Sequence, residues 1–439
     1  MAESNAERLT HSRVLHIALP IVLSNATVPI LGAVDTGVIG QMGLAAPIGA
    51  VGIGAVILSA FYWVFGFLRM GTVGLTAQAD GQGDAGEVAA LLTRALLIGL
   101  GAGVVIIALQ GALFWAAFRV SPASAEVEGL ARQYMAVRVW SAPAAIALYG
   151  ITGWLIAQER TRAVLVLQVW MNGLNVALDL WFVLGLGWGV QGVALATILA
   201  EWSGFALGLW FCRAVFAQTA WRAWGAVFDA ARWRRMMGVN NDILVRSLLL
   251  EAIFVSFMFM GAGQGDVTLA ANQVLLQFLM IASYALDGFA FSAEALVGKA
   301  FGRRNPAQLR RAALLVSGWG MAAAVLMALA FAVAGGVIVD LITTSVEVRT
   351  QARVYLPYLV IMPVIGCAAF MLDGIFVGAT RSRDMRNMMA LSSGVYVACV
   401  LVLAPVLGNH GLWLAMLVSF IARALTLGAR YPALERAAA

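Results

Sequence analysis

Long stretches without a formal charge limit what this chain can fold into more than any other feature of its sequence. Arg94 and Arg119 enclose 24 uncharged residues, and Arg311 and Asp340 enclose 28. A helix needs about 20 consecutive apolar residues to cross the hydrocarbon core of a bilayer. Membrane-spanning β-strands alternate apolar and polar residues, whereas the run Leu96–Ala117 is apolar on every side. The sequence therefore predicts an all-α polytopic membrane protein.

The composition excludes several classes of soluble protein. Of the 439 residues, 62% are hydrophobic and 11% are charged, and the mean hydropathy is +0.89. Soluble proteins carry about 25% charged residues, so a water-soluble enzyme and a disordered chain are both excluded. The net charge of +6 would suit nucleic acid, but the basic residues lie in short loops between the apolar runs. The expected partner is the lipid bilayer, with no nucleic acid.

Charges and clusters of Gly, Asn and Pro divide the chain into twelve expected transmembrane helices. They are 14–38, 49–73, 90–118, 131–157, 163–186, 191–215, 240–262, 268–297, 310–338, 351–377, 387–407 and 411–430. After the sixth span, Trp221, Trp224 and Trp233 lie beside arginines, which indicates an interfacial amphipathic helix. The predicted domains are a six-helix bundle at 1–215, a cytoplasmic interfacial linker at 216–238 and a second bundle at 239–439.

Basic residues predict the orientation of these spans. Of the 28 Lys and Arg residues, 21 fall on the side of the N-terminus, four on the opposite side and three within spans. Cytoplasmic loops of membrane proteins carry the excess of Lys and Arg. Both termini are therefore expected in the cytoplasm, and the protein is expected to be a monomer in the inner membrane of a bacterial cell.

The chain contains an internal repeat. The loop around Gly81 matches the loop around Gly302, and Arg160–Arg162 matches Arg381–Arg383; in both cases the numbering offset is 221. Because two separate loops share this repeat offset, we expect the chain to consist of two copies of a six-helix unit. Six is even, so both units enter the membrane in the same direction, as in transporters built from parallel repeats around a central cavity. A duplication without mechanical meaning is the alternative.

Polar residues within the spans are informative, because a carboxylate at bilayer depth costs about 2.5–3.5 kcal/mol on insertion scales. On the fifth span, four of them recur on one helix face, namely Gln168, Asn172, Asn175 and Asp179. The sixth span carries Thr197 and Glu201, and the first carries Asp35. No basic residue lies within one turn of these acids, so they are suited to binding and releasing protons. Alternatively, Asn175 and Asp179 join helices by hydrogen bonds.

The eighth span has a second polar face, which is expected to line a cavity for a cationic solute. The expected cavity residues are Gln273, Gln277, Tyr284, Asp287 and Glu294, together with Gln168, Asn172 and Glu201. Arg246 on the seventh span is expected to form a structural ion pair with Asp242 or with Asp287. Glu251 and Asp373 are further acids within spans, and the sequence does not reveal their partners.

The chain lacks the sequence signatures of an ATP-driven transporter and of a hydrolase. No G-x-x-x-x-G-K-[ST] loop precedes the single lysine, Lys299. The three histidines stand beside no acid–serine constellation. No enzymatic activity, cofactor or metal is therefore expected. An ion gradient remains as the energy source, since one charge moving down about 100 mV releases about 2.3 kcal/mol.

Five segments together resemble the multidrug and toxic compound extrusion (MATE) transporters, and in particular their DinF-like branch. They are VDTGVIGQMG (34–43), GLTAQADGQGD (74–84), NVALDLWFVLGLGWGVQGVALATILAEW (175–202), DGFAFSAEALVGKAFGRRN (287–305) and DGIFVGATRSRDMRNMM (373–389). The resemblance implies twelve helices in two bundles, an N-lobe and a C-lobe. It also implies export of small amphiphilic, often cationic compounds in exchange for H+ or Na+.

The same resemblance implies roles for individual residues. Asp35, Asn175 and Asp179, with Thr197 nearby, would form the proton site of the DinF-like branch. The bend of the first helix in this family would fall at Pro20.

Two alternatives have the same general architecture. A sodium-coupled branch of the family uses acids of the C-terminal half, and Glu251 and Asp373 would be their counterparts in this chain. The spacing around Asp373 fits that pattern poorly, which favours H+. The other alternative is a flippase for lipid-linked oligosaccharides. Its cavity would favour basic groups for pyrophosphate, whereas the charges within these spans are mostly acidic.

Overall fold

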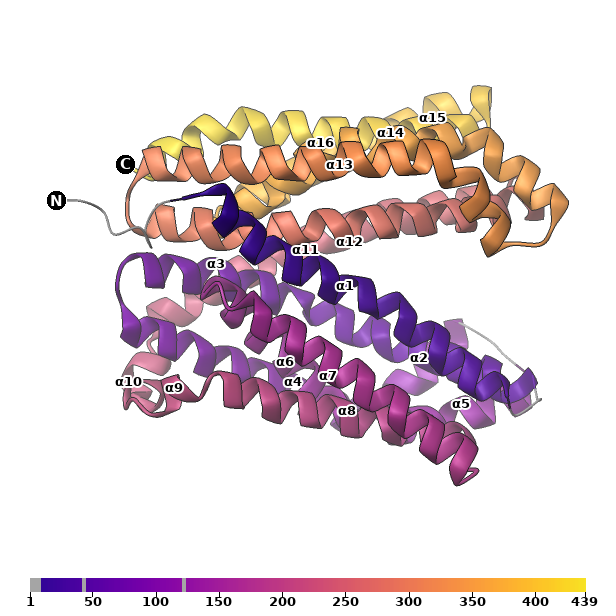
Figure 1. Cartoon of the computed structure of the whole chain (residues 1–439), viewed down its shortest axis with the longest axis horizontal. Coiled ribbons are helices and arrows are strands. Elements are labelled where there is room, and N and C mark those ends of the chain that lie inside the picture. Colours follow the sequence, from indigo (N-terminus) through magenta and orange to yellow (C-terminus); the bar gives the residue numbers. More distant parts are fainter. Residues whose placement is uncertain (1–8, 42–44, 121–123) are drawn as a thin grey trace. The chain divides into compact units, whose positions relative to one another are not determined.

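The computed structural model describes residues 9–41, 45–120 and 124–439, and the side chains of residues 28–33, 35, 36 and 45 lie outside the described set. The described residues form helices joined by short turns (Figure 1). The long helices are α1 (His11–Gly40), α2 (Ala45–Trp63), α3 (Phe67–Gly81), α4 (Ala85–Val120), α5 (Ala125–Arg138), α6 (Ala142–Ala157), α7 (Thr161–Asp179), α8 (Gly189–Phe211), α11 (Ala230–Ala262), α12 (Asp266–Gly302), α13 (Pro306–Ile342), α14 (Val346–Gly378), α15 (Ser382–Leu407) and α16 (Asn409–Ala437). The short elements are α9 (Arg213–Phe216), α10 (Trp224–Val227), the 3-10 turns η1 (Val64–Gly66), η2 (Val139–Ser141) and η4 (Ala220–Arg222), and the π-helical turn η3 (Leu180–Gly185).

Within the described part of the chain, eleven helical spans are long and apolar enough to cross a membrane, and each lies at the place of a predicted span. Helices α2 and α3 form one span through η1, and α5 and α6 form another through η2. Helix α1 adds 30 residues at the predicted first span. The predicted all-α, multi-pass fold is therefore confirmed.

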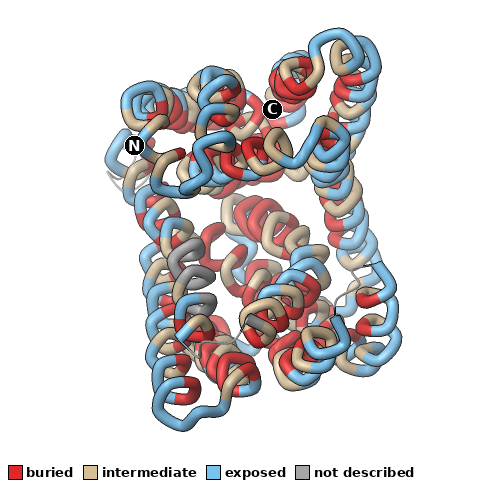
Figure 2. The backbone as a smooth tube through the Cα atoms, turned by 90° about the vertical axis from the view of Figure 1, so that its right-hand side faces the viewer, coloured by how far each residue is buried: buried red, intermediate tan, exposed pale blue. Residues whose placement is uncertain are grey.

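The outer faces of these helices are apolar. Val104 and Trp115 on α4 are 59% and 60% exposed, and Leu326 and Val333 on α13 are 68% and 86% exposed. Buried residues lie on the helix faces that point toward neighbouring helices (Figure 2). Apolar surface of this extent is unfavourable in water, so the exposed faces are the ones that contact lipid.

Contacts divide the chain into two units. One contains residues up to Val22, residues 77–83 and residues 234–439, and the other contains residues 23–76 and 84–233. Helices α1 and α3 therefore each contribute residues to both units. The predicted domain ranges of 1–215, 216–238 and 239–439 stay predictions.

Helices that correspond under the repeat offset pack in corresponding ways. In one unit α13 packs on α14, α15 packs on α16, and α14 packs on α16; in the other α4 packs on α6, α7 packs on α8, and α6 packs on α8. Interlocked aromatic rings fill the core of the unit that contains α11–α16. The rings of Phe257 and Trp413 lie 4.7 Å apart, and those of Phe278 and Phe331 lie 5.1 Å apart.

The repeat also appears in the residues that begin equivalent helices. Asp84 before α4 and Asn305 before α13 each accept a hydrogen bond from the backbone N–H three residues later, at 2.9 Å. Ser124 before α5 and Ser345 before α14 accept in the same way, at 3.4 Å. Such side chains satisfy N–H groups that have no partner within the helix. Both pairs are related by the repeat offset, so the repeat is a property of the fold as well as of the sequence.

A close crossing of α3 and α12 explains the glycines of the two matching loops. A Cβ atom added to Gly81 would overlap the carbonyl oxygen of Lys299, and one added to Gly302 would overlap the carbonyl oxygen of Gln78. The two contacts are equivalent, because Gln78 and Lys299 also correspond to each other under the repeat offset. Glycine is the residue that allows backbones to approach so closely.

The segment between α8 and α11 differs from the prediction. It forms α9, η4 and α10 instead of one amphipathic helix. The guanidinium of Arg94 on α4 donates to the carbonyl oxygens of Ala226 and Val227 at 2.6 and 2.8 Å, and the Thr93 hydroxyl donates to that of Trp221 at 2.9 Å. These side chains of α4 bind carbonyl groups that a continuous helix would use for its own N–H groups. The prediction of a single helix was therefore wrong.

Candidate functional site

Polar side chains connect α7 and α8 with the part of α1 that belongs to the same unit. The Gln168 amide donates to Asn172 Oδ1 at 3.0 Å, and the Asn172 amide donates to the Thr27 hydroxyl of α1 at 2.8 Å. One turn further along α7, the Asn175 amide donates to the Thr197 hydroxyl of α8 at 3.2 Å. The polar face predicted on the fifth span thus contacts polar groups of two other helices.

Burial increases along this face of α7. Asn172 is 8% exposed, Asn175 is 1% exposed and Asp179 is fully buried. The helix ends at Asp179 and passes directly into the π-helical turn η3. A π-helical turn is rare and occurs often at functional sites. A fully buried carboxylic acid therefore lies at the junction of two kinds of helix.

Pro20 and Asp35 both lie on α1. Pro20 is buried, and it lacks the N–H that an interior helix position normally donates, which weakens the helix locally. Two residues later, at Val22, α1 passes from one unit to the other. The side chain of Asp35 lies outside the described residues, so its assignment to the proton site stays a prediction.

Glu201, one turn after Thr197 on α8, is bound by an arginine. The guanidinium of Arg138 donates two hydrogen bonds to its carboxylate, at 2.7 and 3.0 Å. Arg138 also donates to Ser141 and lies over the ring of Tyr62, 5.6 Å from its centre. This ion pair joins α5 to α8 in the interior of one unit. Sequence reasoning missed it, because the partners lie far apart in the chain and no local pattern connects them.

Asp373 on α14 is bound by two guanidinium groups. Arg246 of α11 and Arg423 of α16 both form ion pairs with its carboxylate. These three residues are at most 8% exposed. Arg246 therefore has a partner that the sequence did not indicate. Asp242, one of the partners expected for Arg246, accepts a hydrogen bond from Arg386 at 2.6 Å.

The polar face predicted on α12 changes its environment along the helix. Gln273 and Gln277 are exposed, Tyr284 and Asp287 are half-buried, and Glu294 is 2% exposed. Glu251 on α11 is also exposed. Only one end of the predicted cavity face is therefore buried inside its own unit.

The buried polar residues described above differ in the side chains that surround them. Across residues 9–41, 45–120 and 124–439, no three or more His, Cys, Asp and Glu side chains form a group that could hold a metal ion. Glu201 and Asp373 are bound by arginines, which neutralise their carboxylates. The side chains joined to Asn172 and Asn175 are amides and hydroxyls instead.

Comparison with known proteins supports a role in transport. The MatE family model matches residues 20–181 and again residues 243–403. The two matches coincide with the two halves of the internal repeat. Probable multidrug resistance protein NorM of Rhodopseudomonas palustris is 26% identical, and the alignment covers 99% of this chain and 94% of that protein.

A solved structure and a further relative agree with this assignment. The Vibrio cholerae MATE transporter VcmN in the bent form superposes with a TM-score of 0.86 at 20% identity, covering 98% of this chain and 97% of that chain. DNA damage-inducible protein F of Escherichia coli K12 is 40% identical over 426 residues, which cover 94% of this chain and 90% of that protein. The chain is therefore a DinF-like member of the MatE family of membrane transporters, and not an enzyme.

Proposed function

We propose that the protein exports small amphiphilic, often cationic compounds from a bacterial cell by antiport with H+. Membership of the MatE family supports transport, and the name of the NorM relative supports multidrug resistance as its outcome. The observation that carries the proton assignment is the full burial of Asp179 at the end of the connected polar face of α7.

The proposed proton site consists of Asp35 and Asp179, with Asn175 and Thr197 as hydrogen-bonding neighbours. An ionised carboxylate inside a membrane protein is costly, so taking up a proton lowers the free energy of the state that shields the site from water. The amide of Asn175 and the hydroxyl of Thr197 are able to hydrogen-bond with a carboxyl group in either protonation state. The site therefore loads and releases a proton without a metal or cofactor.

Protonation is proposed to act on α1. Neutralising Asp35 removes the charge that this helix carries within the membrane, and the missing hydrogen bond at Pro20 provides the point at which it bends. Reciprocity then requires that a proton and the exported compound weaken each other's binding in at least one conformation. The pH gradient thereby drives release of the compound outside the cell.

Two alternatives make different demands on the residues. Sodium coupling through Glu251 and Asp373 would require Na+ to displace Arg246 and Arg423 from the Asp373 carboxylate. A lipid-linked oligosaccharide flippase would require basic groups free to bind pyrophosphate. The guanidinium of Arg138, whose side chain is 11% exposed, is instead neutralised by Glu201. Both observations favour H+-coupled efflux of cations.

The orientation of the protein in the membrane is part of the same proposal. The excess of basic residues on one side supports cytoplasmic termini, and we propose the bacterial inner membrane as the location. The monomeric state stays a prediction.

Transport by the purified protein in sealed vesicles tests the proposal. A fluorescent cationic dye is loaded, and either a pH gradient or a Na+ gradient is imposed. We expect dye movement to follow the pH gradient and to be lost in Asp179→Asn. The matched control is Asp340→Asn, which changes an acid that pairs with Arg353 at an exposed helix end. Movement driven by Na+ alone, or undiminished pH-driven transport by Asp179→Asn, would contradict the proposal.

A further inference from the structure

Two arginines are held at the end of α8. An Nη of Arg213, the first residue of α9, donates to the carbonyl oxygen of Trp210 at 3.1 Å. An Nη of Arg160, in the turn between α6 and α7, donates to the carbonyl oxygen of Phe211 at 2.6 Å. Consecutive carbonyl groups in the last turn of one helix therefore position both guanidinium groups. We call Arg160, Arg213 and Trp210 the α8-end cluster; all three belong to one unit.

Neither arginine of the cluster is neutralised by a carboxylate. Both residues are exposed. In the part of the chain that the structure describes, Arg160 and Arg213 form no ion pair, although Glu159 directly precedes Arg160. A guanidinium has five N–H donors, and each of these hydrogen bonds uses one nitrogen. Donors therefore remain on both side chains for a further acceptor.

The second half of the repeat offers an internal comparison. Arg381 is the counterpart of Arg160 under the repeat offset, and its Nε and an Nη both lie 2.8 Å from a carboxylate oxygen of Asp384. The position of Asp384 corresponds to Ala163 in the first half. The first half thus retains the arginine of this turn but lacks the acid that neutralises it.

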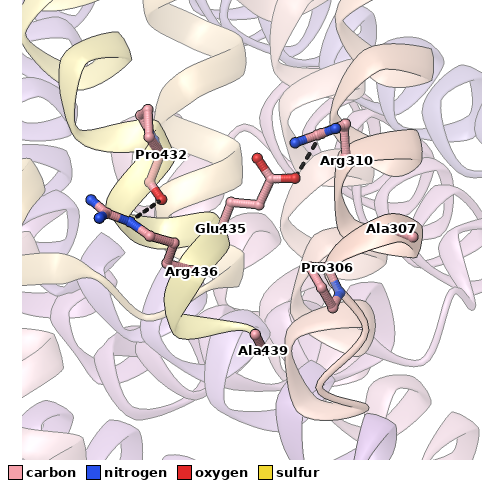
Figure 3. Close-up of a pocket in the computed structure, with 7 residues that line it drawn as sticks. All are labelled: Pro306, Ala307, Arg310, Pro432, Glu435, Arg436 and Ala439. Atoms are coloured by element: carbon pink, nitrogen blue, oxygen red, sulfur yellow. Dashed lines mark hydrogen bonds and ion pairs between the residues drawn. The ribbon is translucent and has the colours of Figure 1, made fainter.

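The end of α16, which corresponds to the end of α8, also carries an acid. There the Glu435 carboxylate lies 2.7 Å from the Nε of Arg310 on α13 (Figure 3). The position of Glu435 corresponds to Ala214, the residue after Arg213. At both places where the second half has a neutralising acid, the first half therefore has alanine.

The α8-end cluster lies at the ends of two membrane spans, Thr161–Gly185 and Gly189–Phe211. Trp210 is 54% exposed, and the guanidinium of Arg213 lies over its ring, 4.1 Å from the centre. Tryptophan is enriched where the membrane meets water, and phospholipid headgroups occupy this depth of the bilayer. Basic pockets between transmembrane helices suit anionic headgroups at this level. A guanidinium suits phosphate in particular, because its N–H donors match two phosphate oxygens.

We propose that the α8-end cluster binds the phosphate group of an anionic phospholipid. Arg160 and Arg213 donate to the phosphate oxygens, and the ring of Trp210 lies beside the headgroup. The ligand is a lipid and not a soluble anion, because the cluster lies where the phosphate groups of the bilayer are concentrated. The site is at the opposite end of α7 from Asp179, so it does not depend on the ion that drives transport.

Titration of the full-length protein in detergent tests this proposal. Native mass spectrometry measures the affinity for the first bound lipid, either phosphatidylglycerol or zwitterionic phosphatidylcholine with the same acyl chains. A basic residue near a membrane surface changes anionic-lipid affinity about fivefold. We therefore expect Arg160→Gln and Arg213→Gln each to weaken phosphatidylglycerol binding about fivefold. The matched control is Arg381→Gln, which removes the same charge from the counterpart that Asp384 already neutralises, and it should have little effect.

Ala163→Asp is the complementary variant, because it introduces the acid that neutralises Arg381 in the second half. An acid suits the first turn of a helix, so the protein should fold, and phosphatidylglycerol binding should weaken about as much as in Arg160→Gln. Ala163→Asn has the same size without the charge and should bind like the wild type.

Three results would overturn the proposal: equal affinities of the wild type for the two lipids, equal losses in Arg160→Gln and Arg381→Gln, or equal binding by Ala163→Asp and Ala163→Asn. If glycerol 3-phosphate binds as tightly as phosphatidylglycerol, the ligand is a soluble anion and the lipid assignment is wrong.

Discussion

The side-chain amide of Asn175 donates a hydrogen bond of 3.2 Å to the hydroxyl of Thr197, which in turn donates to the carbonyl oxygen of Val193 at 2.9 Å. This relay connects α7 to the backbone of α8 one turn before the buried Asp179. The orientation of the amide therefore depends on a hydroxyl of the neighbouring helix, which is a role that a purely apolar side chain cannot take.

Replacing Thr197 with valine should impair transport more than folding. The change preserves shape but removes the hydroxyl that accepts a hydrogen bond from Asn175, and losing one intramolecular hydrogen bond costs about 1 kcal/mol. If that cost falls on the transport cycle, pH-driven efflux should decrease about fivefold. Efflux in sealed vesicles measures the effect, and Thr197→Ser, which keeps the hydroxyl, should restore most of the activity. Wild-type efflux by Thr197→Val would show that the relay has no part in coupling.

The ion pair of Arg138 and Glu201 should be structural. Breaking a buried ion pair from one side leaves an uncompensated charge and costs about 3–5 kcal/mol, whereas replacing both partners by apolar residues costs much less. We expect Arg138→Met and Glu201→Met each to lower the melting temperature in detergent strongly, and the double variant to recover much of the loss. Additive losses in the double variant would rule out this explanation.

Arg94 should determine whether the linker between α8 and α11 stays folded on α4. Its side chain is fully buried, pairs with Glu87 at 2.7 Å and binds two linker carbonyls. Arg94→Met should therefore destabilise the protein by about 3 kcal/mol and accelerate chymotrypsin cleavage near Trp221. The control is Arg213→Gln, which changes an exposed arginine at the start of the same segment and should have little effect. Equal cleavage rates in the two variants would disprove the role of Arg94.

Two glycines related by the repeat should respond alike to alanine. A Cβ on Gly153 would overlap the carbonyl oxygen of Arg69, and a Cβ on Gly374 would overlap that of Ala290, the equivalent of Arg69 in the second half of the repeat. Overpacking of this kind costs about 1–3 kcal/mol. Gly173 on α7 has no atoms within 4 Å of an added Cβ, so Gly173→Ala should be neutral or stabilising. Thermal unfolding of the three variants compares them directly, and a neutral Gly153→Ala would contradict the close packing of α6.

The transmembrane spans were predictable because charged residues are costly in lipid, so the segments that cross the membrane contain few of them. Charge-free runs mark where helices cross, so Arg94–Arg119 and Arg311–Asp340 each enclose most of one observed span. The repeat offset was equally visible, because matching turns need matching residues. The polar face of α7 followed from its helical spacing alone.

Contacts between distant segments were not predictable, because they depend on how helices pack. Nothing local connects Asp373 to Arg423, which lies two helices further along the chain. The prediction for the linker between α8 and α11 failed for the same reason. The conformation of this linker depends on hydrogen bonds from Arg94 of α4, a residue remote from it in the sequence. Asp35 was singled out as an acid within the first span and then assigned a role by family resemblance, but its side chain lies outside the described residues.

The mutual contacts of Gly81 with Lys299 and of Gly302 with Gln78 have a consequence for the origin of the chain. A surface patch that touches its own copy in this swapped manner is the signature of a two-fold homodimer. The crossing of α3 and α12 thus has the geometry by which two identical six-helix subunits would have associated before gene fusion joined them.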